Sequence, residues 1–154
     1  MLHVRPARTT DPEAAPLIEA LTEDYAARYG EPGRSEMTAH PPEEFAPPHG
    51  AFLLLFDRTE LIAGGAFRRF DATTAELKRI WTHAHHRRRG LARRVLTELE
   101  REAKELGYRR LYLTTGPRQP EARGLYLASG YTPLFDVSAD PLTIGPLPFE
   151  KRIA

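Results

Sequence analysis

The chain has 154 residues with 22 basic and 21 acidic side chains, so its formal net charge is +1 and the molecule as a whole is not built to bind a polyanion. It contains no cysteine, which excludes disulfides, thiolate metal sites and a cysteine nucleophile. Its length fits a single domain spanning residues 1–154. Because no apolar run approaches the roughly 20 residues of a membrane span and residues 1–6 lack the apolar core of a signal peptide, we expect a cytoplasmic protein without a membrane partner.

The N-terminal part is predicted to hold a strand at residues 2–7, followed by a helix with Asp11 as its N-cap and Gly30 as its stop. Pro16 lies early in this helix and is expected to kink it or delay its start. Residues 31–50 carry five prolines and few apolar side chains. This composition predicts an irregular connection with one helical turn near residues 42–45.

Three strands are predicted next, and they are followed by the clearest helix of the chain. The strands, at residues 51–56, 61–70 and 75–82, are joined by short turns, a spacing that predicts an antiparallel meander. Residues 90–106 form a helix whose apolar side chains recur at steps of three and four, namely Ala92, Leu96, Leu99, Ala103 and Leu106. The remaining predicted elements are a strand at 110–115, a helix at 119–129, an extended stretch at 131–137 and a strand at 149–153.

The most informative segment is the basic loop that joins the strand at 75–82 to this helix. No acidic residue occurs between His83 and Thr97. A helix N-terminus presents unpaired amides and a partial positive charge, which favour an anion, and Gly90 lets a ligand approach the backbone. The loop therefore suits a diphosphate, while a solvated basic face and a nucleic-acid surface remain alternative interpretations. Three nearby histidines lack a carboxylate partner, so no metal site is expected.

Two blocks of sequence resemble one known family. Arg87-x-x-Gly90-x-Ala92 resembles the Gln/Arg-x-x-Gly-x-Gly/Ala signature of the Gcn5-related N-acetyltransferase (GNAT) superfamily, and it lies between a strand and an amphipathic helix as that family requires. Farther on, Gln119-x-x-Ala122-x-x-Leu125-Tyr126-x-x-x-Gly130-Tyr131 resembles the family's second signature. The chain departs from the pattern at Arg88, where many members have glycine, and at Gln119, where asparagine is common. The resemblance covers residues 51–133 well and residues 2–30 more loosely.

The resemblance implies an α/β (α+β) fold with a mixed, mostly antiparallel central sheet flanked by helices. It also implies acetyl-CoA as cosubstrate, an amine as acceptor, no nucleic-acid partner, and a fold on which homodimers are common. The strand at 75–82 and its parallel neighbour are expected to splay apart and admit the coenzyme arm. The expected coenzyme contacts are Ile80, Trp81, Thr82, Arg87, Arg88, Arg89, Gly90, Leu91, Ala92, Arg93, Gln119 and Tyr126, with the Ile80 amide polarising the thioester.

Two residues are candidate catalytic groups. Glu76 is the candidate general base, with His83 and His85 as further candidates, and its alternative is a structural carboxylate paired with Lys78 or Arg79. Tyr126 is the candidate proton donor to the leaving thiolate. Because the chain has no cysteine and no convincing serine triad, we expect the amine to attack the thioester directly rather than through a covalent acyl-enzyme. The acceptor pocket is expected between the first helix, residues 31–50 and the segment after Phe135, with Tyr25, Tyr29 and Phe45 as candidate wall residues. A non-catalytic acetyl-CoA-binding sensor on the same fold is the alternative function, and the acceptor itself stays open.

Overall fold

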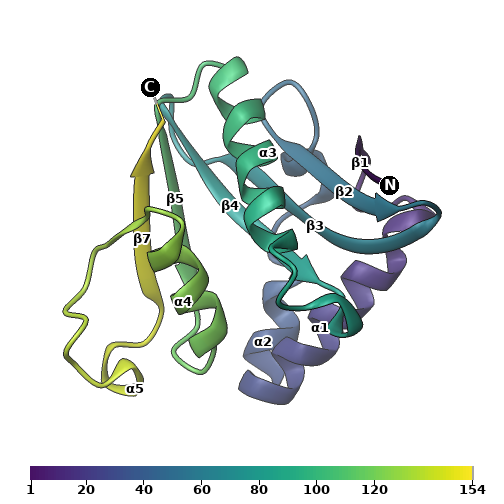
Figure 1. Ribbon diagram of the computed structural model, residues 1–154. Helices are drawn as coiled ribbons and strands as arrows, with labels where there is room; N and C mark the ends of the chain where they lie inside the picture. The colour runs from purple at the N-terminus through teal and green to yellow at the C-terminus, as the bar shows by residue number, and fades with distance from the viewer. Residues whose placement is uncertain (154) are drawn as a thin grey trace.

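The structure, a computed structural model, describes residues 1–153 and is organised around one sheet of seven strands in the order β1-β2-β3-β4-β5-β7-β6 (Figure 1). Every neighbouring pair is antiparallel except β4 and β5, which run parallel. The strands are β1 (Leu2–Pro6), β2 (Ala51–Asp57), β3 (Glu60–Arg69), β4 (Thr74–Thr82), β5 (Arg110–Thr115), β6 (Thr132–Pro133) and β7 (Leu147–Arg152). The predicted mixed, mostly antiparallel sheet is confirmed.

Helices cover both faces of the sheet. In Figure 1, α3 (Leu91–Glu105) and α4 (Pro120–Ala128) lie in front of the strands, whereas α1 (Ala15–Tyr29) lies at the lower right and α2 (Glu31–Glu36) at the bottom near the centre. Two hydrophobic cores result, one between the sheet and α3 with α4, and one between the sheet and α1. In the described part of the chain, no helix combines the length and hydrophobicity that crossing a bilayer requires.

The helix α3 follows the predicted apolar stripe closely. Leu96, Leu99 and Ala103 are buried against the sheet as predicted, together with Leu91 and Val95. Leu106 is 41% exposed, because the helix ends at Glu105 and its last predicted apolar residue lies in the C-cap. At roughly 1.5–3 kcal/mol for each large aliphatic side chain, this stripe holds α3 firmly on the sheet.

Several predicted boundaries were wrong in the N-terminal part. Residues 31–50 were predicted to be irregular apart from one turn, but they contain α2 as well as the predicted turn at Pro42–Phe45. The helix forms because Pro32 is tolerated in its first turn and Gly33 has no Cβ that would collide with the Tyr25 carbonyl. Asp11 precedes a separate 3₁₀ turn at Pro12–Ala14, so α1 begins only at Ala15, in line with the expected delay at Pro16.

Two predictions near the C-terminus also needed correction. Only Thr132–Pro133 of the expected extended stretch pairs as a strand, while β7 starts at Leu147, two residues before the predicted position. Between them lies α5 (Pro141–Ile144), a single turn whose first amides are capped by the Asp140 carboxylate accepting from the Leu142 amide.

β4 carries a bulge that sets the direction of its last side chains. Lys78 pairs with Ala66 and Trp81 pairs with Gly64, so Arg79 and Ile80 together lie opposite one residue of β3. Arg79 has φ of 62°, a left-handed conformation that costs a non-glycine residue about 1–2 kcal/mol. Because of the bulge, Ile80 packs in the core beneath α3, while Lys78 and Arg79 both reach the α2 side of the sheet.

Candidate active site

A cleft of about 550 Å³ opens where β4 and β5 separate, and it is called the central cleft below. The two strands pair only from Thr74 to Glu76 on β4 and then diverge, as the resemblance implied. The lining includes Leu77, Lys78, Arg79 and Ile80 from β4, Thr114 and Thr115 at the end of β5, residues 116–119 after it, Ala122 and Tyr126 from α4, Tyr25 and Tyr29 from α1, Pro32, Gly33 and Glu36 from α2, and Leu142, Gly145 and Pro146. The three segments expected to wall the acceptor pocket therefore all border this cleft.

The free edge of β4 presents backbone donors toward the side that β5 has left. The His83 amide donates to the Ile62 carbonyl on β3, 2.8 Å away. Successive amides along a strand point to alternate sides, so those of Ile80 and Thr82 are directed away from β3. Trp81 was also predicted to contact the coenzyme. Its ring instead packs on the core on the α1 side, and it does not line the cleft.

The basic loop continues β4 and turns into α3. Arg88 and Gly90 both have positive φ, 64° and 74°, and α3 begins directly after Gly90. The Arg94 amide is the first to bond back into the helix, to the Gly90 carbonyl, so the amides from Gly90 to Arg93 have no intrahelical partner. Arg88, Arg89 and Arg93 are exposed. The loop's free amides and exposed arginines suit an anion. This anion would lie outside the central cleft, because none of the loop residues belongs to the cleft lining.

The histidines of this loop contact one another rather than a cleft. His83 Nδ1 accepts from the His85 amide, and His86 lies between Glu60, at 3.3 Å, and Arg89, at 2.6 Å. Within residues 1–153, no group of three histidine, aspartate or glutamate side chains is arranged to hold a metal ion.

Tyr126 reaches the central cleft from α4 and is only 6% exposed. Its ring packs against Tyr131 and Phe149, with centroids 5.6 Å away in both pairs. The Tyr126 hydroxyl makes no hydrogen bond in the described part of the chain. It is also not one of the side-chain atoms that are fully buried without a partner, so it retains some exposure to solvent. Because Tyr126 lines the central cleft, the hydroxyl borders that cleft. Burial raises the pKa of the Tyr126 phenol well above its usual range, which keeps the proton on the oxygen at neutral pH.

Gln119 lies at the N-cap of α4 and holds the loop that precedes the helix. Its side-chain oxygen accepts from the Gly116 amide at 3.0 Å and from the Tyr29 hydroxyl at 3.2 Å. Tyr29 in turn accepts from the Arg118 amide at 3.1 Å. This bridge ties α1 to the loop after β5 across the cleft, so the Gln119 oxygen is already engaged by the protein.

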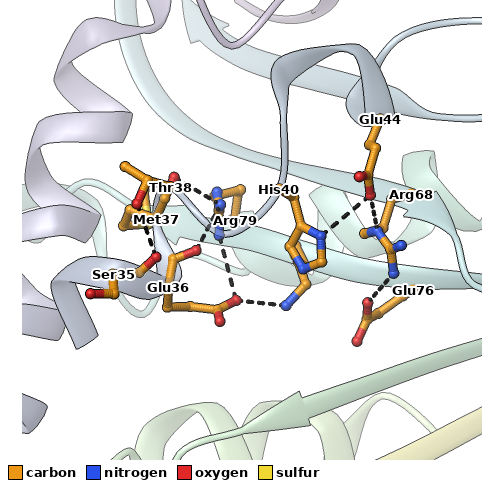
Figure 2. Close-up of polar contacts among 10 residues, drawn as sticks. Ser35, Glu36, Met37, Thr38, His40, Glu44, Arg68, Glu76 and Arg79 are labelled. Atoms are coloured by element: carbon orange, nitrogen blue, oxygen red, sulfur yellow. Dashed lines mark hydrogen bonds and ion pairs between the residues drawn. The ribbon is translucent and has the colours of Figure 1, made fainter. Parts of the chain in front are cut away.

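Glu76 belongs to a chain of ionic contacts on the α2 side of the sheet, shown in Figure 2. Its Oε1 atom accepts from Arg68 Nη1 at 2.9 Å, and Arg68 Nε bonds to Glu44, which also faces His40 at 3.3 Å. The Arg68 hydrogen bond lowers the pKa of Glu44. The expected structural partners of Glu76 were wrong, because Lys78 and Arg79 contact Glu36 instead.

The sequence alone did not single out Arg68 or Arg79 as site residues. Both are charged side chains on central strands of the sheet, and Arg79 is 4% exposed. The sequence did contain a signal for Arg79. Lys78 and Arg79 are adjacent in a nine-residue strand, and because side chains alternate along a strand, one of the two cations is expected on a buried face. Phe45, a candidate wall residue, is buried beneath Arg79 rather than in the central cleft.

Comparison with known proteins agrees with this architecture. Residues 16–131 match the model of the acetyltransferase (GNAT) family. YsnE of Bacillus subtilis (strain 168), an uncharacterized N-acetyltransferase, is 34% identical over 107 residues, which are 66% of this chain and 71% of YsnE.

Two solved structures share the fold over nearly their full length. PaiA N-acetyltransferase from Thermoplasma acidophilum, in complex with coenzyme A, has a TM-score of 0.72 and 18% identity over 99% of each chain. A GNAT family acetyltransferase from Elizabethkingia anophelis with acetyl-CoA bound has a TM-score of 0.70 and 15% identity, covering 98% of this chain and 97% of the other. The chain therefore belongs to the acetyltransferase (GNAT) family and is a GNAT-family N-acetyltransferase, which confirms the prediction from the two sequence blocks.

Proposed function

We propose that the protein transfers an acetyl group from acetyl-CoA to the primary amine of a small molecule or peptide by direct attack. The observation that carries this proposal is the central cleft, in which the Tyr126 hydroxyl, without a hydrogen bond to any residue of 1–153, borders the space left where β4 and β5 separate. Acetyl-CoA is the natural donor to consider because related folds were crystallised with coenzyme A or acetyl-CoA.

The chain offers a suitable surface for each part of the donor. The diphosphate fits the amides of residues 88–93 at the start of α3, of which those of Gly90 to Arg93 have no intrahelical partner. The neighbouring arginines, including Arg87, add positive charge. The amides of Ile80 and Thr82 on the edge of β4 fit the coenzyme arm. The Ile80 amide is the proposed donor to the thioester oxygen, where negative charge develops as the carbonyl is attacked.

The reaction balances with one base and one acid. The acceptor ammonium ion first loses a proton, because an amine with a pKa near that of lysine, about 10.4, is charged at neutral pH. The amine nitrogen then bonds to the acetyl carbon, the carbon–sulfur bond breaks, and the nitrogen releases its second proton to the solvent water. Tyr126 gives its proton to the departing thiolate and regains one from water, so that the products are an amide and a free thiol.

Glu76 is the proposed base and acts through a water molecule. Its Oε1 atom is bonded to Arg68, while its Oε2 atom has no hydrogen bond among residues 1–153. The competing interpretation is that Glu76 serves only the ion-pair chain with Arg68 and Glu44. Glu76→Gln and Arg68→Gln separate the two. A base predicts that only the glutamate change lowers kcat by about 100-fold, whereas a purely structural pair predicts similar losses of stability and similar kcat for both.

Two measurements on the purified protein test the proposed function. Calorimetry with CoA and acetyl-CoA tests the donor site, and thiol release with a panel of amines tests turnover. We expect binding in the micromolar range and release of one thiol per acetylated amine. Absence of CoA uptake at millimolar ligand would refute the donor site. Uptake without turnover on any amine would refute the reaction and leave a coenzyme-binding sensor.

A further inference from the structure

Arg79 is a buried cation held in a fixed position on the α2 side of β4. Its side chain is 3% exposed, and its guanidinium lies over the Phe45 ring at 5.3 Å. Figure 2 shows the Nη2 group donating to the last carbonyls of the α2 region, those of Glu36 at 3.3 Å and Met37 at 3.2 Å. These contacts fix the plane of the guanidinium, so its remaining donors point in defined directions.

The remaining donors of Arg79 are not used within the described residues. Its Nε and Nη1 groups make no hydrogen bond there, and the nearest carboxylate oxygen, Glu36 Oε1, is 4.0 Å from Nη1. That oxygen accepts from Lys78 Nζ at 2.7 Å. Arg79, Lys78 and Glu36 together carry one net positive charge. The unused nitrogens are also not sealed from solvent. Among residues 1–153, Ser129 Oγ is the one fully buried side-chain nitrogen or oxygen that lacks a hydrogen-bond partner, so the unbonded Arg79 nitrogens are not fully buried.

A second cavity, of about 270 Å³, is lined in part by Arg79 and is called the arginine pocket below. Its polar lining consists of Arg79, three threonine side chains and an imidazole, and its apolar lining includes Ile18, Met37 and Phe45. The polar residues other than Arg79 are Thr9, Thr10, Thr38 and His40. Among the described residues no carboxylate lines this pocket, whereas Glu36 lines the central cleft, so an anion is favoured on the pocket side of Arg79.

We propose that the arginine pocket binds the carboxylate of the amine acceptor, which makes the acceptor a small amino acid rather than a simple amine. This inference rests on the proposed acetyl transfer. Arg79 lines both cavities, and Ile80, the proposed donor to the thioester, also lines the central cleft, so Arg79 connects the arginine pocket with the cleft in which the reaction is proposed. One net positive charge matches a monoanion better than a dianionic phosphate, and the apolar wall fits a short methylene chain.

Acceptors that differ only in the carboxylate test the inference. The panel is the series of ω-amino acids from glycine to 6-aminohexanoate, each paired with its methyl ester, assayed by thiol release from acetyl-CoA. We expect the preferred acid to exceed its ester in kcat/KM by about 30-fold or more, the effect of removing one partner of a buried charge pair. Arg79→Gln should abolish this preference, so that each acid and its ester have kcat/KM values within about threefold of one another. The exposed Arg101 supplies the matched control, Arg101→Gln, which should keep the preference.

Because Arg79 also holds the end of α2, a gentler variant keeps the inference testable if Arg79→Gln does not fold. Thr9→Val and Thr10→Val together leave the guanidinium in place and should raise the ratio of KM for the acid to KM for the ester about tenfold. Equal rates for acid and ester in the wild type, or an Arg79→Gln loss shared by both, would overturn the carboxylate site while leaving acetyl transfer intact.

A binding measurement separates this inference from the reaction. The same series is titrated calorimetrically into the wild type and the double threonine variant in the absence of acetyl-CoA. Binding of at least one acid but not its ester, weakened in the variant, supports the arginine pocket even if no amine is acetylated. Failure of every acid to bind at millimolar concentration, with or without CoA present, would refute it.

Discussion

Replacing Tyr126 by phenylalanine removes one oxygen that borders the central cleft and little else. The hydroxyl has no hydrogen bond to another described residue, so no protein donor or acceptor is left unpaired by the change. The ring keeps its packing on Tyr131 and Phe149, at 5.6 Å in both cases. We therefore expect the free energy of unfolding to change by less than about 0.5 kcal/mol, as for substitutions that break no buried contact.

The catalytic effect should be much larger than the effect on stability. A positioned acid or base contributes about 10²–10⁴-fold to a rate, and a thiolate is a fair leaving group, so the lower end applies. We expect kcat to fall about 100-fold, which corresponds to about 2.7 kcal/mol in the barrier. Burial raises the pKa of the Tyr126 phenol, so the wild-type rate should show no loss from deprotonation of this group up to about pH 10.

Stopped-flow measurement of thiol release at saturating acetyl-CoA and amine gives kcat for the wild type and the variant. Tyr112→Phe is the matched control, since Tyr112 lies on β5 outside the cleft lining and packs its ring against Phe70. A Tyr126→Phe variant that binds CoA normally and retains kcat within twofold would refute the assignment of Tyr126 as the proton donor. A fall in both tyrosine variants would point to the β5–α4 region as a whole.

Three further changes probe the frame of the site. Glu44→Gln should lower the free energy of unfolding in urea by about 0.5–1 kcal/mol at pH 7 and leave it unchanged near pH 2. Arg68 lowers the pKa of Glu44, so this stabilisation is present above the unfolded pKa and is lost as the pH falls through the folded pKa. An equal loss at both pH values would contradict this. Gly90→Ala should lower Tm by a few degrees and weaken CoA binding, because a φ of 74° costs alanine about 1 kcal/mol. The added Cβ itself would meet no heavy atom within 4 Å. An unchanged Tm would show that the turn relaxes. Tyr131→Phe should lower the free energy of unfolding by about 1.5–3 kcal/mol without changing kcat, because it removes the 2.8 Å hydrogen bond to the Glu100 carboxylate. A loss of kcat with unchanged stability would contradict this structural role.

Local signals in the sequence were sufficient for much of the fold. The short turns between apolar runs predicted the β2–β3–β4 meander, and the stripe behind Gly90 predicted α3 to within a residue at each end. These features depend on neighbours a few residues apart, which is why a pattern of residue types specifies them. Shorter elements were missed or misplaced. A six-residue helix such as α2 contains too few turns for a periodic stripe, and its packing on Tyr25 decides its conformation.

The sequence by itself determined the family and therefore the basic loop, Glu76 and Tyr126 as the candidate machinery. Only the tertiary structure decided what these groups face. The bulge at Arg79 overrides the alternation of β4 and places that cation beneath α2 beside the arginine pocket. Glu76 meets Arg68 because antiparallel pairing sets β3 opposite β4 in one register. Both outcomes depend on register and on contacts between distant segments, which residue periodicity within one strand does not encode.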